Sequence, residues 1–253
     1  MKLSIVVPAY NEKNTIIPLL DRVVMSKTQL PKEIIVVDDG STDGTSKLIK
    51  VYEEDFIKKG KDEIYNSELK IISKANGGKG SALYEGFKHA TGDIIGVQDA
   101  DLEYFPEDYH LILEPMLKGV TRVCYGSRFM GRYVPHGMCF KNIVGNMVLN
   151  LTAWVLYGFG CVTDLATCYK FWFREDIPIE ELKSKGFEFC PVQFSAAWNR
   201  GLEVYEVPVR YKGRDFAEGK KISTLDGFYE LWTLIKLRWK KSYTTEKMDQ
   251  ELE

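Results

Sequence analysis

Residues 33–44 read EIIVVDDGSTDG, an apolar run that ends in two acids and a glycine-containing turn. The run predicts a buried strand, and the turn predicts the start of a helix because Ser, Thr and Asp are common helix N-caps. The same alternation precedes it, with LSIVVPAY (3–10) typical of a strand and NEKNTIIPLLDRVVMS (11–26) typical of a helix. Strands that alternate with helices predict an α/β protein with a parallel sheet.

The alternation continues on the C-terminal side and then loosens. Further strands are expected at 69–73 and 93–101, with helices at 41–55 and 78–91 between them. Beyond residue 105 the expected elements are helices at 106–118, 137–160, 191–200 and 228–241, strands near 121–129 and 202–211, and a mixed segment at 163–174. The sequence therefore predicts a regular βαβ first half and a less regular second half.

The composition is that of a globular protein without an unusual charge. Of 253 residues, 45% are hydrophobic and 28% are charged, which excludes disorder on a large scale. The formal net charge of −2 gives no overall attraction to nucleic acid. Five cysteines without CxxC spacing, and an N-terminus without the apolar core of a signal peptide, predict a reducing, cytoplasmic location and no disulfide framework.

Three acids alternate in VQDADLEYF at 97–105, namely Asp99, Asp101 and Glu103. If the preceding strand continues through them, alternate side chains share one face and the three charges gather there. Such a cluster favours a hard divalent cation, since Mg²⁺ and Mn²⁺ take carboxylate oxygens together with substrate phosphates. A solvated turn after a strand is the alternative.

Polar segments follow three other strands at the edge where parallel strands bind ligands. They are PAYNE (8–12), DDGSTDG (38–44) and NGGKG (76–80). Asp39 is placed to accept hydrogen bonds from a base or ribose, although this segment could equally serve to cap the next helix. Lys79, among glycines before a helix, suits a phosphate or a base edge.

Several of these motifs together resemble a known family. IVVPAYNE, VVDDGSTDGT, NGGKGSAL, the GD pair at 92–93 and QDADLE are similar, in this order, to the nucleotide-sugar-binding half of family 2 inverting glycosyltransferases. The later segments GSRF (126–129), GN (145–146), TDLATCYKFW (163–172) and VPVRYKGRDFAEGKKIS (207–223) resemble the polyprenyl-phosphate sugar transferases, the group that contains dolichol-phosphate mannose synthase.

The resemblance implies a Rossmann-like GT-A fold with a mostly parallel central sheet and amphipathic interface helices in the C-terminal half. One domain would span residues 1–240, with a nucleotide-sugar-binding half at 1–105 and an acceptor and membrane-interface half at 106–240, followed by a polar tail at 241–253. The implied reaction moves a sugar from a nucleotide-diphosphate sugar, of the GDP-mannose or UDP-glucose type, to a polyprenyl (dolichyl or undecaprenyl) phosphate with inversion.

The resemblance also assigns residues to roles. Mg²⁺ or Mn²⁺ would be held by Asp99, Asp101 and Glu103, and Asp101 and Arg128 would be catalytic. The nucleotide sugar would be bound by Pro8, Tyr10, Glu12, Asp39, Lys79 and Asp99. The acceptor phosphate would be bound by Arg128, Arg214 and Lys221. A lipid phosphate is already ionised near pH 7, its second pKa being about 6, so it needs no general base.

Two other functions remain open at this point. A family 2 transferase that acts on a saccharide or protein hydroxyl needs a general base, and Asp164 is a candidate for it. A nucleotide-binding scaffold without turnover is the second alternative, although an intact acid cluster and two basic acceptor segments argue against it.

The apolar segment 143–160 approaches the length of a membrane span but carries Asn146 and Asn150 four residues apart, on one helical face. Placing amides in hydrocarbon is costly, so this segment is expected to be an amphipathic or buried helix. The helix at 228–241 combines Trp232 and Trp239 with basic residues, as interfacial helices do, or it is a core helix with a solvated basic face. We expect peripheral attachment to the cytoplasmic face of a membrane.

Overall fold

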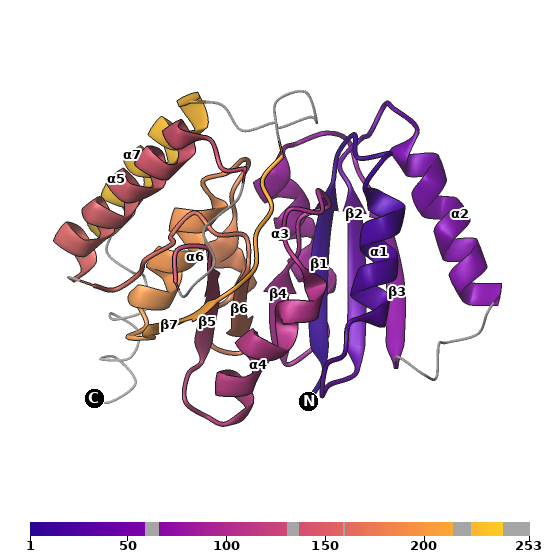
Figure 1. Cartoon of the computed structure of the whole chain (residues 1–253), viewed down its shortest axis with the longest axis horizontal. Coiled ribbons are helices and arrows are strands. Elements are labelled where there is room, and N and C mark those ends of the chain that lie inside the picture. Colours follow the sequence, from indigo (N-terminus) through magenta and orange to yellow (C-terminus); the bar gives the residue numbers. More distant parts are fainter. Residues whose placement is uncertain (59–65, 131–136, 159, 215–223, 240–253) are drawn as a thin grey trace, which may run out of the picture.

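The structure is a computed structural model, and it describes residues 1–58, 66–130, 137–158, 160–214 and 224–239. Seven strands form one sheet with helices on both faces (Figure 1). The strands are β1 Leu3–Ala9, β2 Lys32–Asp38, β3 Ser67–Ser73, β4 Ile94–Val97, β5 Val123–Ser127, β6 Lys170–Phe173 and β7 Val204–Pro208. The helices are α1 Ile16–Met25, α2 Thr45–Lys58, α3 Lys79–His89, α4 Tyr109–Leu117, α5 Phe140–Tyr157, α6 Phe189–Trp198 and α7 Thr224–Trp239, with short 3₁₀ turns at Pro106–Asp108 and Ile179–Leu182. The expected polar tail and Lys221 lie outside the described residues.

The sheet is mostly parallel, as the sequence predicts, with the order β3-β2-β1-β4-β6-β5-β7. Strand β6 is the exception, because it pairs antiparallel with both β4 and β5. This strand lies in the segment 163–174, for which the sequence predicts only mixed structure, because the four residues KFWF are all buried and show no alternation. Gly96 of β4 faces Phe171 of β6, and a Cβ at Gly96 would lie 2.4 Å from the phenyl ring.

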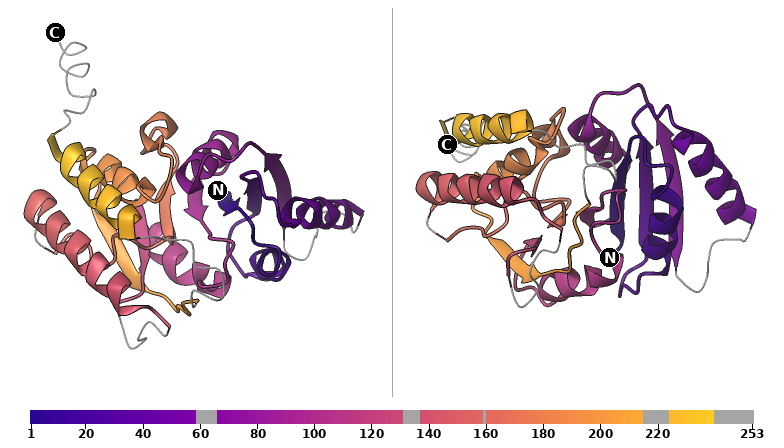
Figure 2. Two further views of the ribbon diagram at one scale, coloured as in Figure 1. Left: turned by 90° about the horizontal axis from the view of Figure 1, so that it is seen from above. Right: turned by 45° about the horizontal axis from the view of Figure 1, so that its top comes forward.

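Two hydrophobic cores lie on opposite faces of the sheet. Ile5 and Val7 of β1 belong to the core covered by α1 and α4, whereas Val6 belongs to the core covered by α3, α5, α6 and α7. Because both faces are buried, the central strands are apolar at nearly every position, which explains why they read as continuous runs instead of alternating ones. Figure 2 shows the same layered arrangement from two further directions.

Helix α5 buries Asn146 and Asn150 on its inner face beside apolar residues such as Leu149 and Ala153, and it leaves other apolar side chains exposed on its outer face. Asn150 donates to the Thr163 carbonyl and accepts from the Leu165 amide, and Asn146 accepts from the Ala166 amide. These two asparagines therefore fasten the helix to the 163–166 segment. No helix among the described residues is long and apolar enough to cross a membrane. The sequence predicts an amphipathic or buried helix at this position, and α5 is a helix that buries both asparagines and exposes part of its apolar surface.

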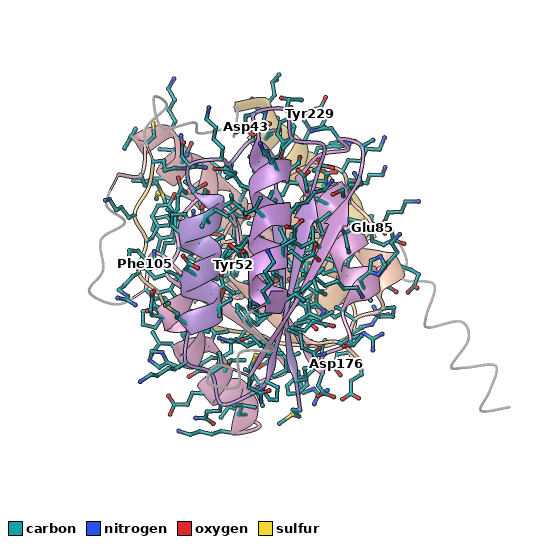
Figure 3. The ribbon with its side chains drawn as sticks, turned by 90° about the vertical axis from the view of Figure 1, so that its right-hand side faces the viewer. Asp43, Tyr52, Glu85, Phe105, Asp176 and Tyr229 are labelled. Carbon is teal, nitrogen blue, oxygen red and sulfur yellow. The ribbon has the colours of Figure 1, made fainter. Side chains whose placement is uncertain are left out.

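The carboxyl ends of the parallel strands share one edge of the molecule. In Figure 3, Asp43 in the loop after β2 and Tyr229 on α7 lie at this edge, and Asp176 lies at the opposite one. The expectation that the three acids continue a strand is wrong, because β4 ends at Val97. The chain then turns, with Leu102 at a left-handed φ of 62°, so a loop and not strand alternation positions the acids.

Candidate active site

A cleft with a volume of about 390 Å³ lies at the carboxyl edge of the sheet, between the two halves of the chain. Such a volume is in the range of small-molecule sites. Every residue to which the resemblance assigns a role and that the structure describes lines it: Pro8, Tyr10, Glu12, Asp39, Lys79, Asp99, Asp101, Glu103, Arg128 and Arg214. The folding of distant segments onto one edge therefore brings the predicted residues together.

Asp39 holds the loop that leads into α3. One of its carboxylate oxygens accepts from the Lys74 ammonium at 2.6 Å, and the other accepts from the Gly78 amide at 2.8 Å. Gly78 has a φ of +90°, and a Cβ there would lie 2.5 Å from the Lys185 carbonyl oxygen, so glycine is required. Contact of Asp39 with a base or ribose stays a prediction, and its observed partners show a role in fixing the cleft wall.

Lys79, the first residue of α3, forms an ion pair with Asp99 at 2.7 Å. The Lys79 ammonium also contacts the Cys168 thiol at 3.0 Å, and this thiol in turn hydrogen-bonds to Asp99. Burial works to lower the pKa of Lys79, but the charges of Asp99, Cys168 and Cys190 together with the hydrogen bond to Asp99 outweigh it and raise the pKa well above its ordinary value. Lys79 is therefore a fixed cation at the centre of the cleft.

Arg214 bridges the carboxylates on the other side of the cleft. Its guanidinium bonds Glu12 at 3.0 Å and lies 3.4 Å from Asp101. Burial works to lower the pKa of Arg214, and the hydrogen bond to Glu12 together with the charge of Asp101 raises it overall. Glu103 accepts from the Arg214 amide at 2.9 Å and from the Tyr211 hydroxyl at 2.5 Å. In this structure Arg214 thus neutralises carboxylates of the predicted donor side.

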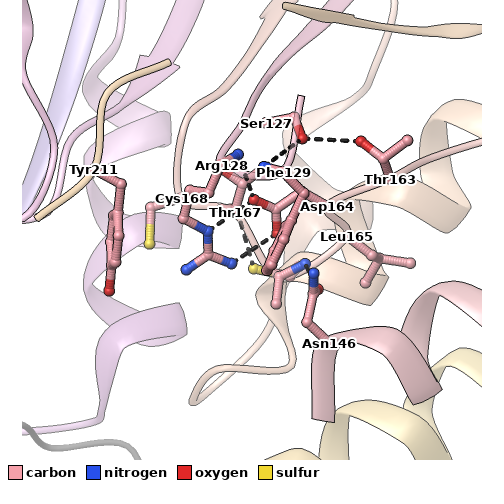
Figure 4. Close-up of polar contacts among 12 residues, drawn as sticks. Ser127, Arg128, Phe129, Asn146, Thr163, Asp164, Leu165, Thr167, Cys168 and Tyr211 are labelled. Carbon is pink, nitrogen blue, oxygen red and sulfur yellow. Dashed lines mark hydrogen bonds and ion pairs between the residues drawn. The ribbon is translucent and has the colours of Figure 1, made fainter. Parts of the chain in front are cut away.

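Arg128 is held by a buried carboxylate. Its Nε and Nη2 each donate to Asp164 at 2.7 Å, and Asp164 is completely buried (Figure 4). The Arg128 guanidinium lies over the rings of Tyr211 and Tyr104, at 5.1 and 5.9 Å from their centroids. No hydrogen bond to Nη1 is found among the described residues, and Arg128 lines the cleft. The Arg128 guanidinium can therefore donate from Nη1 to an oxygen of a ligand in the cleft.

The acids of the cleft fit a divalent cation that arrives with phosphate ligands. Burial and the charges of Asp99 and Glu103 raise the pKa of Asp101 to about 7, a strain that a cation would relieve. In the parts of the chain that the structure describes, no three His, Cys, Asp or Glu side chains are grouped closely enough to hold an ion. Mg²⁺ and Mn²⁺ commonly take only one or two carboxylates and complete their coordination with phosphate and water.

Sequence reasoning missed several side chains that line the cleft, among them Tyr104, Cys168, Tyr211 and Glu230. Cys168 and Tyr211 lie within segments that carry the family resemblance, so their place near the site has a sequence signal. Glu230 has no such sequence signal, because the aromatic and basic residues of its helix indicate an interface and not a binding site.

Comparison with known proteins shows the family of this chain. The pattern of the family described as Glycosyl transferase family 2 matches residues 4–138. UDP-N-acetylglucosamine–dolichyl-phosphate N-acetylglucosaminyltransferase of Methanococcus voltae is 26% identical over 94% of this chain and 97% of its own length. Dolichol-phosphate mannosyltransferase of Pyrococcus furiosus is 26% identical over 88% of this chain, which spans 61% of that protein.

The fold has a solved counterpart in glucosyl-3-phosphoglycerate synthase from Mycobacterium tuberculosis, crystallised with Mn²⁺, uridine diphosphate and glucosyl-3-phosphoglycerate. The two structures align with a TM-score of 0.65 and 20% identity, over 93% of this chain and 79% of the synthase. The same synthase was also crystallised with Mg²⁺ and uridine diphosphate. The predicted GT-A fold is confirmed. Because the family pattern covers more than half of the chain, this protein belongs to glycosyltransferase family 2.

Proposed function

We propose that this glycosyltransferase moves a sugar from a nucleotide-diphosphate sugar to a polyprenyl phosphate, with inversion at the anomeric carbon. The observation that carries the proposal is the cleft itself, which is lined by the carboxylates Asp99 and Asp101 and by Arg128, an arginine anchored to Asp164. Two relatives are named for transfer to dolichyl phosphate, which supports a lipid phosphate as the acceptor.

The donor would lie along the N-terminal half of the cleft, with its nucleotide near Pro8, Tyr10 and Asp39. Asp99 and Asp101 would hold Mg²⁺ or Mn²⁺, which when bound neutralises the charge of the departing diphosphate. Both oxygens of Glu103 already accept hydrogen bonds, so we assign it to positioning Tyr211 and the Arg214 backbone. Lys79 supplies a fixed positive charge beside the diphosphate.

The acceptor phosphate would bind at Arg128 with no general base. A phosphate oxygen attacks the anomeric carbon from the face opposite the diphosphate, the bond from that carbon to the diphosphate oxygen breaks, and no proton moves. Asp164 is a poor candidate for a general base, because both of its oxygens accept from Arg128 and it is completely buried. This observation favours a phosphate acceptor over a hydroxyl acceptor. The roles of Arg214 and Lys221 at the acceptor stay predictions.

The outer faces of α5 and α7 form an apolar surface that suits a membrane. The two helices pack against one another and lie side by side in Figures 1 and 2. Their exposed large hydrophobic side chains are Phe140, Val144, Met147, Val148, Leu151, Val155, Leu225, Phe228, Tyr229, Trp232 and Trp239. We infer that this surface lies in the lipid headgroup layer, with Lys236 and Arg238 beside it, and brings the cleft to the acceptor.

Nucleoside diphosphate release tests this function. Wild-type protein is given GDP-mannose, UDP-glucose or UDP-N-acetylglucosamine with Mn²⁺, each with no acceptor, with polyprenyl phosphate, or with the matching polyprenyl alcohol. Release that depends on the phosphate is the expected result. Equal release with the alcohol would indicate a hydroxyl acceptor, and no release with any donor would indicate a scaffold.

A further inference from the structure

Glu230 is a buried carboxyl group that lines the cleft and takes no part in the reaction described above. It lies on the inner face of α7, one turn before the fully buried Leu234, and is 3% exposed. Within the ranges that the structure describes, no hydrogen bond or ion pair reaches its carboxyl group. Buried carboxyl groups are costly unless something hydrogen-bonds to them, so a carboxyl group at this position of the cleft suits a ligand that donates hydrogen bonds.

The nearby cations are committed to other groups. Lys79 pairs with Asp99, and Arg128 pairs with Asp164. Lys170 donates to the Leu165 carbonyl and lies 3.5 Å from the centroid of the Tyr125 ring.

Burial raises the pKa of Glu230 to about 7. The charge of Asp226 adds to this rise, whereas the positive charges of Lys79, Lys170 and Arg128 lower the pKa and only partly offset it. Cys190 of α6 lines the same cleft, and burial together with the charge of Glu230 raises the pKa of its thiol. The carboxyl group is thus desolvated and poorly compensated by its surroundings.

The surroundings select the kind of ligand. An anionic phosphate would be repelled by the carboxylate, and a further cation would be repelled by Lys79, Lys170 and Arg128. A neutral molecule with several hydroxyl groups satisfies the carboxyl oxygens without adding charge. Phe187, which also lines the cleft, offers an apolar surface to the carbon atoms of a sugar ring.

We propose that Glu230 accepts hydrogen bonds from hydroxyl groups of the donor sugar and thereby selects that sugar. This inference rests on the proposed function, since it requires the sugar of a nucleotide-diphosphate sugar to lie between Lys79 and α7. Glu230 is then a specificity residue on the helix that also contributes to the apolar outer surface, so one helix would serve both the donor and the membrane.

Calorimetric binding separates the sugar from the nucleotide. Wild type, Glu230→Ala and Glu230→Gln are titrated with UDP-glucose, UDP-N-acetylglucosamine and GDP-mannose, and with UDP and GDP alone, all with Mn²⁺. Asp226→Asn, which changes a carboxylate one turn away on the same helix, is the matched control. We expect Glu230→Ala to weaken the preferred nucleotide sugar by about tenfold or more, as loss of a charged hydrogen bond does, and to leave its diphosphate unaffected. Glu230→Gln, which keeps one acceptor oxygen, should lose less.

Three outcomes would overturn the inference. Equal weakening of the nucleotide sugar and its diphosphate would show that Glu230 acts on the nucleotide or on the fold. Unchanged affinity for both would show that the carboxyl group meets no sugar. A wild-type protein that binds none of these compounds would overturn the proposed function as well, whereas the first two outcomes leave it standing.

Discussion

Replacing Asp164 by asparagine tests whether the carboxylate is a structural anchor for Arg128. Asp164 is completely buried, and its two oxygens accept three hydrogen bonds from Arg128, two from the guanidinium at 2.7 Å and one from the backbone amide at 2.9 Å. The asparagine side chain would leave the guanidinium without a counter-charge. It would also replace one accepting carboxylate oxygen by an NH₂ group, which donates. Removing one partner of a buried ion pair costs about 3–5 kcal/mol, which for a domain of this size lowers the melting temperature by about 10 °C.

Urea unfolding followed by tryptophan fluorescence measures this change. Asp55→Asn is the control, because Asp55 lies 3.8 Å from Lys58 in an exposed pair whose loss should change stability by less than about 1 kcal/mol. An Asp164→Asn variant that is as stable as wild type but inactive would refute the reasoning. That result would place Asp164 in the chemistry and support a hydroxyl acceptor.

Asp101→Ala should fold normally by circular dichroism yet fall below about a tenth of the wild-type rate, a barrier increase of more than about 1.4 kcal/mol, and a faster variant would remove Asp101 from the cation site. Glu230 has a folded pKa of about 7 against 4.5 for an ordinary glutamate, so wild type loses stability as pH rises through this interval. Glu230→Gln should therefore be more stable than wild type by up to about 3 kcal/mol at pH 8 and equal to it at pH 4, and equality at both pH values would contradict the burial argument. Trp239→Glu should weaken binding to anionic lipid vesicles, measured by sedimentation, and wild-type binding should fall with salt. If wild-type protein does not bind the vesicles at any salt concentration, this result would argue against membrane docking.

The first half of the fold could be predicted because its signals are local. The sequence of β1, β2 and β4 is an apolar run in each case, and these runs end before Pro8, Asp38 and Gln98, respectively. Helices of regular period lie between the strands. β6 could not be predicted, because a short strand buried on both faces has no alternation and its antiparallel direction depends on pairing with β4 and β5. Such pairing is a long-range property that a local pattern does not encode.

The site was predictable as a set of residues but not as a set of contacts. The motifs and the resemblance selected side chains that line one cleft, whereas the partners of those side chains come from distant segments. Arg128 and Asp164 are 36 residues apart, and Arg214 and Glu12 are 202 residues apart. These pairings decide which groups remain available for ligands, and they depend on how the second half folds over the first.

Analysis of the lipid product tests the central claim most directly. Wild-type protein is incubated with polyprenyl phosphate in vesicles, Mn²⁺ and the nucleotide sugar that it binds best, and the extracted lipid is examined by mass spectrometry and NMR. The account predicts a sugar linked to the polyprenyl phosphate whose anomeric configuration is opposite to that of the donor. A product with retained configuration, or a sugar found only on a hydroxyl acceptor, would contradict it.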